Sequence, residues 1–233
     1  MDVDILINKN ALPMPAVSAS VSCMDLGNLA DSIKKVEDSD VAFFHYDVVD
    51  GKFNKCYILG DIFCEYLKQH SNLPIEVHLA VYDIDNYVDI FAKKKVDYIA
   101  VHYEAMNNPK ETFAKIRDLG ATPVLAYRAD TKPQEDLIEL APLCAWILKL
   151  TVNPGFSGQK MNPQAIEHIK IMKKMLENHG IKTRIQADGN VNSNTIKTLF
   201  DAGATIFTGG TSGLFIPNKT IRENLNNLLK PLK

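Results

Sequence analysis

The chain has 233 residues, 46% of them hydrophobic and 23% charged, which is the composition of an ordinary soluble domain large enough to bury a sizeable core. Its formal net charge of -2 excludes a general nucleic-acid or membrane-surface binder, because no excess of positive charge would attract a polyanion. The four cysteines form no CxxC pair and the first residues, MDVDILINKN, lack the pattern of a signal peptide, so we expect a cytoplasmic protein without membrane spans.

Short apolar runs typical of β-strands alternate with stretches of helical spacing along the whole chain. The predicted strands are 17–22, 41–46, 75–79, 98–102, 122–126, 146–150, 183–187 and 205–208. The predicted helices are 26–37, 60–70, 84–95, 109–120, 133–141, 162–180, 192–203 and 218–230. Asp83, Asn162 and Asn192 are candidate N-caps, and Gly120 and Gly180 are expected at helix ends.

This repeated order of strand and helix, with no linker or change in composition, predicts an α/β protein with a single (β/α)8 TIM barrel domain over residues 1–233. A doubly wound open sheet is the main alternative. Such sheets usually carry a glycine-rich turn after the first strand, and the corresponding segment, SCMDLG, is not a dinucleotide fingerprint. We therefore favour the barrel.

Barrel enzymes place their catalytic groups at the C-terminal ends of the strands. The polar residues that follow the predicted strands are Ser20, Ser22, His45, Asp47, His78, His102, Arg128, Thr151, Asp188 and the segment 209–212. Nearly all the unusual chemistry is therefore predicted to lie on one rim. His102 and Glu104 alternate at one strand end, where we expect them to line the rim or to hydrogen-bond other site residues.

Two imidazoles and two carboxylates on this rim predict a metal site. His45 and Asp47 in HYDVVDG are two residues apart, so their side chains point to the same face of a strand. His78 in EVHLAV and Asp188 in QADGN follow two other predicted strands. Nitrogen and oxygen ligands in this mixture suit a borderline divalent ion such as Zn, Mn, Fe or Co, with Mg as an alternative. One such histidine alone would more often be structural.

Glycine-containing turns on the late strands predict a phosphate site. They are NPGFSGQ at 153–159, DGNV at 188–191 and GGTSG at 209–213. Glycine lets the backbone approach an anion, and barrels commonly bind phosphate after their last two strands. No basic cluster lies nearby, so backbone amides and the hydroxyl of Thr211 or Ser212 would bind the phosphate.

A metal beside two carboxylates, with a phosphate site across the rim, predicts proton transfer next to the carbonyl of a small sugar phosphate. Carboxylates on opposite sides of a planar intermediate can remove a proton from one face and return it to the other. The outcome would be inversion at one carbon.

Seven segments resemble the ribulose-phosphate 3-epimerase family: SVSCMDLGNL, HYDVVDGKF, EVHLAV, VHYEA, TVNPGFSGQK, QADGN and AGATIFTGGTSGLF. The resemblance implies a metal-dependent (β/α)8 isomerase that inverts C3 of a ketose phosphate. It implies that His45, Asp47, His78 and Asp188 bind the metal and that Asp47 and Asp188 are the acid/base pair. The implied substrate and phosphate contacts are Ser20, His78, Gly155, Phe156, Ser157, Gly158, Gly189, Asn190, Val191, Gly210 and Thr211.

Three departures from the family pattern concern the substrate pocket. Val49, Ala80 and Leu150 stand where the family usually has methionines around the intermediate, and we expect Ala80 to open space there. The segments SCMDL and GTSGLF are more similar to the allulose-6-phosphate 3-epimerase branch, which acts on a six-carbon ketose phosphate. This similarity predicts that the chain epimerises a hexulose phosphate in preference to ribulose 5-phosphate. Arg128 would either contact a longer substrate or pair with an acidic neighbour.

Other functions stay open at this stage. Lyase or decarboxylase barrels use an Asp-x-Lys-x-x-Asp array after the third strand, and HLAVYD contains no lysine. A non-catalytic barrel that binds metal and sugar phosphate for regulation is the alternative from a different class. We expect a small phosphorylated ketose as the ligand, no nucleic-acid or membrane partner, and a homo-oligomer.

Overall fold

The computed structural model describes residues 12–153 and 158–233, and within them eight parallel strands form a closed barrel. The barrel strands are β1 (Ala16–Ser20), β2 (Phe43–Asp50), β4 (Ile75–Ala80), β5 (Tyr98–His102), β6 (Thr122–Tyr127), β7 (Trp146–Leu150), β8 (Arg184–Asp188) and β9 (Ile206–Gly209). Pairing of β1 with β2 and with β9 closes the ring, with Ser18 opposite Phe43 on one side and Thr208 on the other. The predicted TIM barrel is confirmed.

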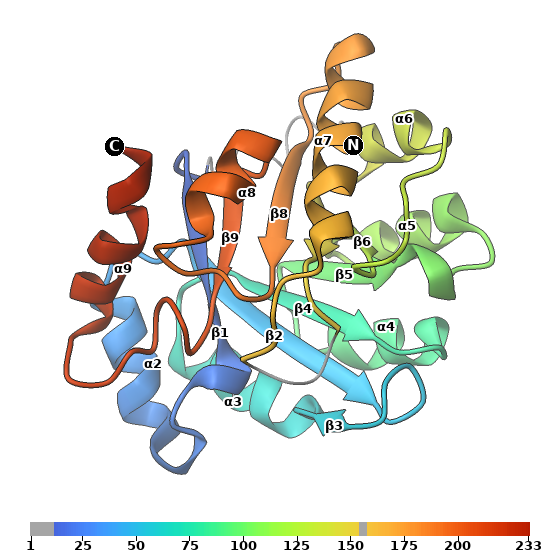
Figure 1. The fold of residues 1–233 in the computed structure, drawn as a ribbon. Coiled ribbons are helices and arrows are strands. Elements are labelled where there is room, and N and C mark those ends of the chain that lie inside the picture. Colours follow the sequence, from blue (N-terminus) through green and yellow to red (C-terminus); the bar gives the residue numbers. More distant parts are fainter. Residues whose placement is uncertain (1–11, 154–157) are drawn as a thin grey trace.

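Helices surround the strands and cover their outer faces (Figure 1). They are α2 (Leu29–Glu37), α3 (Asp61–His70), α4 (Ile84–Ala92), α5 (Pro109–Asp118), α6 (Leu137–Leu140), α7 (Pro163–Asn178), α8 (Ile196–Ala202) and α9 (Ile221–Leu229). Short 3-10 turns are η1 (Val21–Cys23), η2 (Leu26–Asn28), η3 (Tyr103–Ala105), η4 (Ala141–Leu143) and η5 (Lys230–Leu232). No helix in the described ranges has the length and apolar character needed to cross a bilayer.

The predicted caps have mixed outcomes. Asn162 caps α7, since its side chain accepts a hydrogen bond from the amide of Gln164. Gly120 and Gly180 follow α5 and α7 with positive φ angles of 92° and 66°, as expected for helix ends. Helix α8 itself begins after Thr195, but the Asn192 side chain accepts the amide of Asn194 over 2.9 Å in the turn that leads into it, so Asn192 caps this turn rather than α8.

Two boundaries also differ from the predictions. Strand β2 continues to Asp50, because its last residues pair with a short antiparallel strand, β3 (Tyr57–Ile58), that sequence periodicity did not indicate. The helix predicted over 133–141 is reduced to the single turn of α6. Upstream of it, the buried ammonium of Lys149 donates to the carbonyl oxygens of Arg128 and Thr131 and holds the preceding segment in a loop.

The core has two layers that leave room for a polar site at one end. A large apolar cluster lies between the strands and the helices, and a smaller one fills the inside of the barrel. At the first residues of their strands, the rings of Phe43 and Tyr98 lie 5.2 Å and 4.4 Å from that of Trp146. Among the described residues, these aromatic rings fill the N-terminal end of the barrel, and the best-formed cavity lies at the opposite rim, where barrel enzymes place their active sites.

Candidate metal and substrate site

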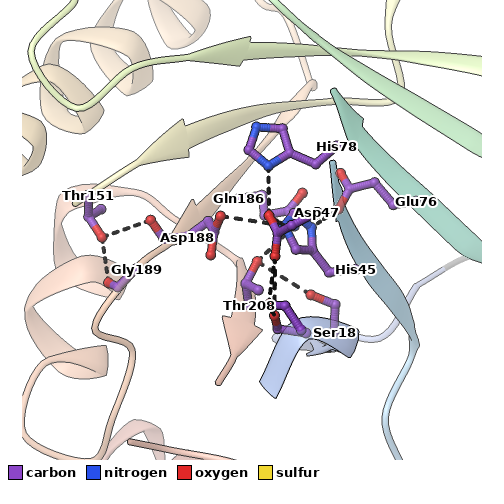
Figure 2. A network of polar contacts seen from close by, with 12 residues as sticks. Ser18, His45, Asp47, Glu76, His78, Thr151, Gln186, Asp188, Gly189 and Thr208 are labelled. Carbon is purple, nitrogen blue, oxygen red and sulfur yellow. Dashed lines mark hydrogen bonds and ion pairs between the residues drawn. The ribbon is translucent and has the colours of Figure 1, made fainter. Parts of the chain in front are cut away.

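The four predicted metal ligands meet at the C-terminal rim (Figure 2). One nitrogen or oxygen atom from each of His45, Asp47, His78 and Asp188 lies within 4.8 Å of the others. Asp47 Oδ1 is 3.0 Å from both His45 Nε2 and His78 Nδ1, and Asp188 Oδ2 is 3.5 Å from His45 Nε2.

Strand register explains this convergence. Asp47 on β2 lies directly opposite His78 on β4, and His45 lies opposite Glu76. All four of these side chains therefore point to the inside of the barrel, because residues two apart share a strand face. Asp188 ends β8, and closure of the barrel brings it beside β2.

A buried carboxylate determines which nitrogen of His45 faces the centre. Glu76 Oε2 lies 2.6 Å from His45 Nδ1, and the two Glu76 oxygens also accept hydrogen bonds from Trp146 and Gln186. Nδ1 of His45 therefore faces Glu76, and Nε2 is the nitrogen that faces the centre. This pairing of a carboxylate with the far nitrogen is typical of metal-binding histidines.

The electrostatics of the four residues favour a bound cation. Burial alone would lower the pKa of the His45 imidazole, but the carboxylates of Asp47, Asp188 and Glu76 raise it well above its usual value. Burial alone would raise the pKa of Asp47, but His45 and His78 lower it well below its usual range. The carboxylates thus favour a positive charge at this centre, either a proton on His45 or a cation in its place, and the mixed nitrogen and oxygen donors fit a divalent metal ion.

Two serines hold one of these carboxylates from the opposite side. The hydroxyls of Ser20 and Ser22 donate to Asp47 Oδ2 over 3.3 Å and 3.2 Å. Ser20 was predicted to contact the substrate, and it lines the cavity described below. Its bond to Asp47 is a contact that the sequence pattern did not indicate.

His102 and Glu104 lie beside His78. His102 Nε2 is 2.9 Å from His78 Nε2, and His102 Nδ1 is 3.0 Å from Glu104 Oε2. Burial lowers the pKa of His102 to about 4, so its ring is neutral near pH 7. Burial would raise the pKa of Glu104, but the contact with His102 and the amide of Arg128 lower it to about 2. We expected these residues either to line the rim or to hydrogen-bond other site residues, and the structure shows the hydrogen bonds.

A cavity of about 400 Å³ opens beside the four ligands. The predicted contact residues that line it are Ser20, His78, Gly158, Gly189, Asn190, Val191, Gly210 and Thr211. The other three predicted contacts, Gly155, Phe156 and Ser157, lie outside the described residues. Lining residues that sequence reasoning missed include Cys23, Leu26, Tyr57 and Val152. Tyr57 belongs to β3, which sequence periodicity did not reveal.

The late-strand side of the cavity is built from turns rather than charges. Gly189 and Asn190 have positive φ angles of 118° and 50°. The Thr151 hydroxyl contacts the carbonyl oxygens of Asp188 and Gly189 and fixes this turn (Figure 2). Among the described lining residues there is no lysine or arginine, so an anion here would meet amides and hydroxyls.

The three positions that replace methionine are placed differently from one another. Leu150 lines the cavity as predicted. Val49 and Ala80 are buried in a small cluster with Phe53 and are absent from the described lining of this cavity, so their place around the substrate stays a prediction. The space that Ala80 was expected to open is covered by Phe53, which is only 3% exposed.

Arg128 acts as a link between two loops. Its guanidinium lies 4.7 Å from the centre of the Phe53 ring and donates to the Phe53 carbonyl oxygen over 3.3 Å. Asp130 is 3.9 Å away. Arg128 is absent from the described cavity lining, so of the two predicted roles, contact with a longer substrate has no support and the acidic neighbour is present.

Comparisons with known proteins agree with this geometry. The model of the ribulose-phosphate 3-epimerase family matches residues 16–221. A ribulose-phosphate 3-epimerase from Methanocaldococcus jannaschii is 35% identical over 199 residues, covering 85% of this chain and 84% of the relative. The enzyme of the same name from Bacillus subtilis is 32% identical over 202 residues, covering 85% of this chain and 92% of the relative.

Solved structures support the fold alone. A mutant tryptophan synthase alpha-subunit from Pyrococcus furiosus superposes with a TM-score of 0.64, covering 92% of this chain and 97% of that one. Only 14% of the residues are identical, so this likeness extends to the barrel and not to its chemistry.

Proposed function

The chain belongs to the ribulose-phosphate 3-epimerase family, and we propose that it inverts C3 of a ketose phosphate in the cavity beside His45, Asp47, His78 and Asp188. It is an isomerase by family. The observation that carries the proposal is that two carboxylates, Asp47 and Asp188, reach the same nitrogen of His45 from different strands, at 3.0 Å and 3.5 Å. Asp47 and Asp188 both line the cavity, so a flat sugar intermediate there would have a carboxylate within reach of each face.

We propose that His45, Asp47, His78 and Asp188 hold one divalent metal ion, whose charge would stabilise the negative oxygen that develops when the carbon acid ionises. One of the two aspartates removes the proton from C3, and the other delivers a proton from the opposite side. In the reverse reaction the two exchange roles. The hydrogen bonds from Ser20 and Ser22 keep Asp47 oriented during this transfer.

Phosphate binding would use the other side of the cavity. The turns at Gly189–Val191 and Gly210–Ser212 line it there, and amides and hydroxyls in such turns can bind a phosphate without a basic side chain. This placement fixes the sugar with its reacting carbon toward the carboxylates. Ser22 and Cys23 line the same cavity and would contact the sugar.

The proposed substrate is a pentulose phosphate. The matched relatives are named ribulose-phosphate 3-epimerases. The preference for a hexulose phosphate depended partly on room at Ala80, and Phe53 covers that residue. Turnover of ribulose 5-phosphate and of allulose 6-phosphate by the same metal-loaded preparation decides between the two, and a strong preference for the six-carbon sugar would reverse this assignment.

Isotope exchange tests the reaction itself. The purified protein, with added Zn²⁺ or Mn²⁺, is incubated with ribulose 5-phosphate in deuterated water. We expect deuterium to enter C3 as the epimer accumulates, because the proton returned from the second carboxylate comes from solvent. Binding of the sugar phosphate with no exchange at C3 would contradict catalysis and support the regulatory, non-catalytic barrel.

A further inference from the structure

A chain of hydrogen bonds leads from the proposed ligand His78 away from the metal centre. His78 Nε2 lies 2.9 Å from His102 Nε2, and His102 Nδ1 lies 3.0 Å from Glu104 Oε2. The second oxygen of Glu104 accepts the backbone N–H of Arg128 over 2.8 Å. Both imidazoles are essentially inaccessible to solvent, at 1% and 0% exposure, so water does not replace these partners.

In this series of hydrogen bonds, the donor is known with certainty only at the Arg128 end. The backbone N–H of Arg128 can donate but never accept, so it orients the Glu104 carboxylate with one oxygen turned to His102. That oxygen accepts from Nδ1 of His102. A neutral His102 then has a bare Nε2, which accepts the proton on Nε2 of His78. Nδ1 of His78 lies 3.0 Å from Asp47 Oδ1, where either a proton or a cation must lie between the two atoms, so Nδ1 is the nitrogen that a metal ion would engage.

We propose that Glu104 is a positioning residue that acts through His102 to hold His78 in the tautomer protonated on Nε2, so that Nδ1 is offered to the metal ion. This inference rests on the metal site of the proposed function. His45 is controlled differently, because Glu76 contacts its Nδ1 directly and leaves Nε2 toward the centre. The two histidines thus present different ring nitrogens, each selected by its own glutamate.

The surroundings of His102 hold the chain of contacts in place. The centre of the Phe53 ring lies 4.6 Å from that of the His102 ring, and the Arg128 guanidinium lies over the same Phe53 ring, 4.7 Å from its centre. Arg128 therefore supports this series of hydrogen bonds in two ways: its backbone amide orients Glu104, and its side chain packs on Phe53, which contacts His102. A covered hydrogen bond is electrostatically stronger than one in water.

Glu104→Gln tests the proposal with a change of one atom. Arg128 N–H and His102 Nδ1 contact different oxygens of Glu104, and in Gln one of these positions becomes an NH2 donor, so His102 Nδ1 no longer has to be the donor. We expect Zn²⁺ affinity, measured by competition with a chelating dye, to fall about 10-fold to 100-fold. Nitrogen-15 NMR of the metal-free protein should show a smaller share of His78 protonated on Nε2 than in the wild type.

Two further variants separate positioning from a general structural effect. Glu139→Gln makes the same change at an exposed carboxylate that pairs with Lys110, and it should leave both readouts unchanged. Glu104→Asp keeps two acceptor oxygens and should recover part of the lost affinity. If Glu104→Gln does not fold, the His78 tautomer of the Zn²⁺-loaded wild type decides instead, and protonation on Nδ1 there overturns the proposal.

The possible failures are distinguishable. Wild-type affinity and an unchanged His78 tautomer in a folded Glu104→Gln variant overturn the positioning role while leaving the epimerase intact. A wild-type protein that binds no Zn²⁺ and exchanges no deuterium at C3 refutes the proposed function itself.

Discussion

The two halves of the barrel rim are built by different means. Strands β2, β4 and β5 contribute ionisable side chains, and each imidazole there has a glutamate behind it, directly for His45 and through His102 for His78. Strands β8 and β9 contribute one carboxylate, Asp188, and otherwise neutral turns with glycine and hydroxyl groups. Charge is therefore concentrated where the proposed mechanism moves a proton, and the opposite half offers the neutral donors that the proposal assigns to the phosphate.

Of all the changes considered, metal removal should have the largest effect, and it acts on the charged half of the rim. Treating the protein with a chelator should abolish epimerisation and lower thermal stability, since the crowded lone pairs and carboxylates lose the ion that separates them. A ligand present at about 100 times its Kd stabilises the folded state by about 2.7 kcal/mol. Calorimetry and activity before and after Zn²⁺ addition check both effects. Full activity of demonstrably metal-free protein would refute the prediction.

Asp188→Asn should have the next largest effect. The change removes one of two acid/base groups and a metal ligand, so kcat should fall by about 10²-fold to 10⁴-fold or more. Deuterium exchange at C3 measures the remaining proton transfer. Asp201→Asn, at a surface carboxylate paired with Lys197, is the matched control and should be fully active. Activity of Asp188→Asn near that of the control would count against the two-carboxylate mechanism.

Gly189→Ala tests the neutral half. At its φ of 118° an added Cβ would lie 2.5 Å from Val152 Cγ2 and 2.9 Å from Thr151 Oγ1. We expect a loss of about 1–3 kcal/mol in unfolding free energy and a raised KM, because the turn must shift. Gly120→Ala has a similar strain at φ 92° with no atom within 4 Å, and it lies at a helix end. An equal rise of KM in both variants would contradict a role of the Gly189 turn in binding.

Thr211→Val should have the smallest effect. Removal of one hydroxyl that can bind a charged phosphate should raise KM about 10-fold and leave kcat nearly unchanged. Steady-state kinetics with the phosphorylated ketose measures both constants. An unchanged KM would place the phosphate elsewhere in the cavity.

The charged half was predictable from residue type and spacing. His45 and Asp47 share a strand face by their spacing alone, and imidazoles or carboxylates at strand ends are uncommon enough to attract attention. The role of Glu76 was not predicted, because it depends on Trp146 of β7 and Gln186 of β8. No local sequence pattern shows which residues of distant strands meet inside a barrel.

The neutral half was predictable only in outline. Glycines indicated turns, but their identity does not say which amides point inward. The packing of Phe53, in a loop after β2, against Val49 and Ala80 was not predictable, because no local pattern shows that this loop returns to them. The strand β3 was missed because it is only two residues long and depends on pairing with the end of β2.

The carboxylate of Glu76 joins two regions that barrels usually keep apart. It accepts the indole N–H of Trp146 from the aromatic floor and contacts His45 at the reactive rim. In most barrels, residues at the N-terminal end serve stability, and residues at the C-terminal rim serve catalysis. Here a change of the indole would alter the basicity of His45, the proposed metal ligand, so we expect thermal stability and turnover to be coupled at that position.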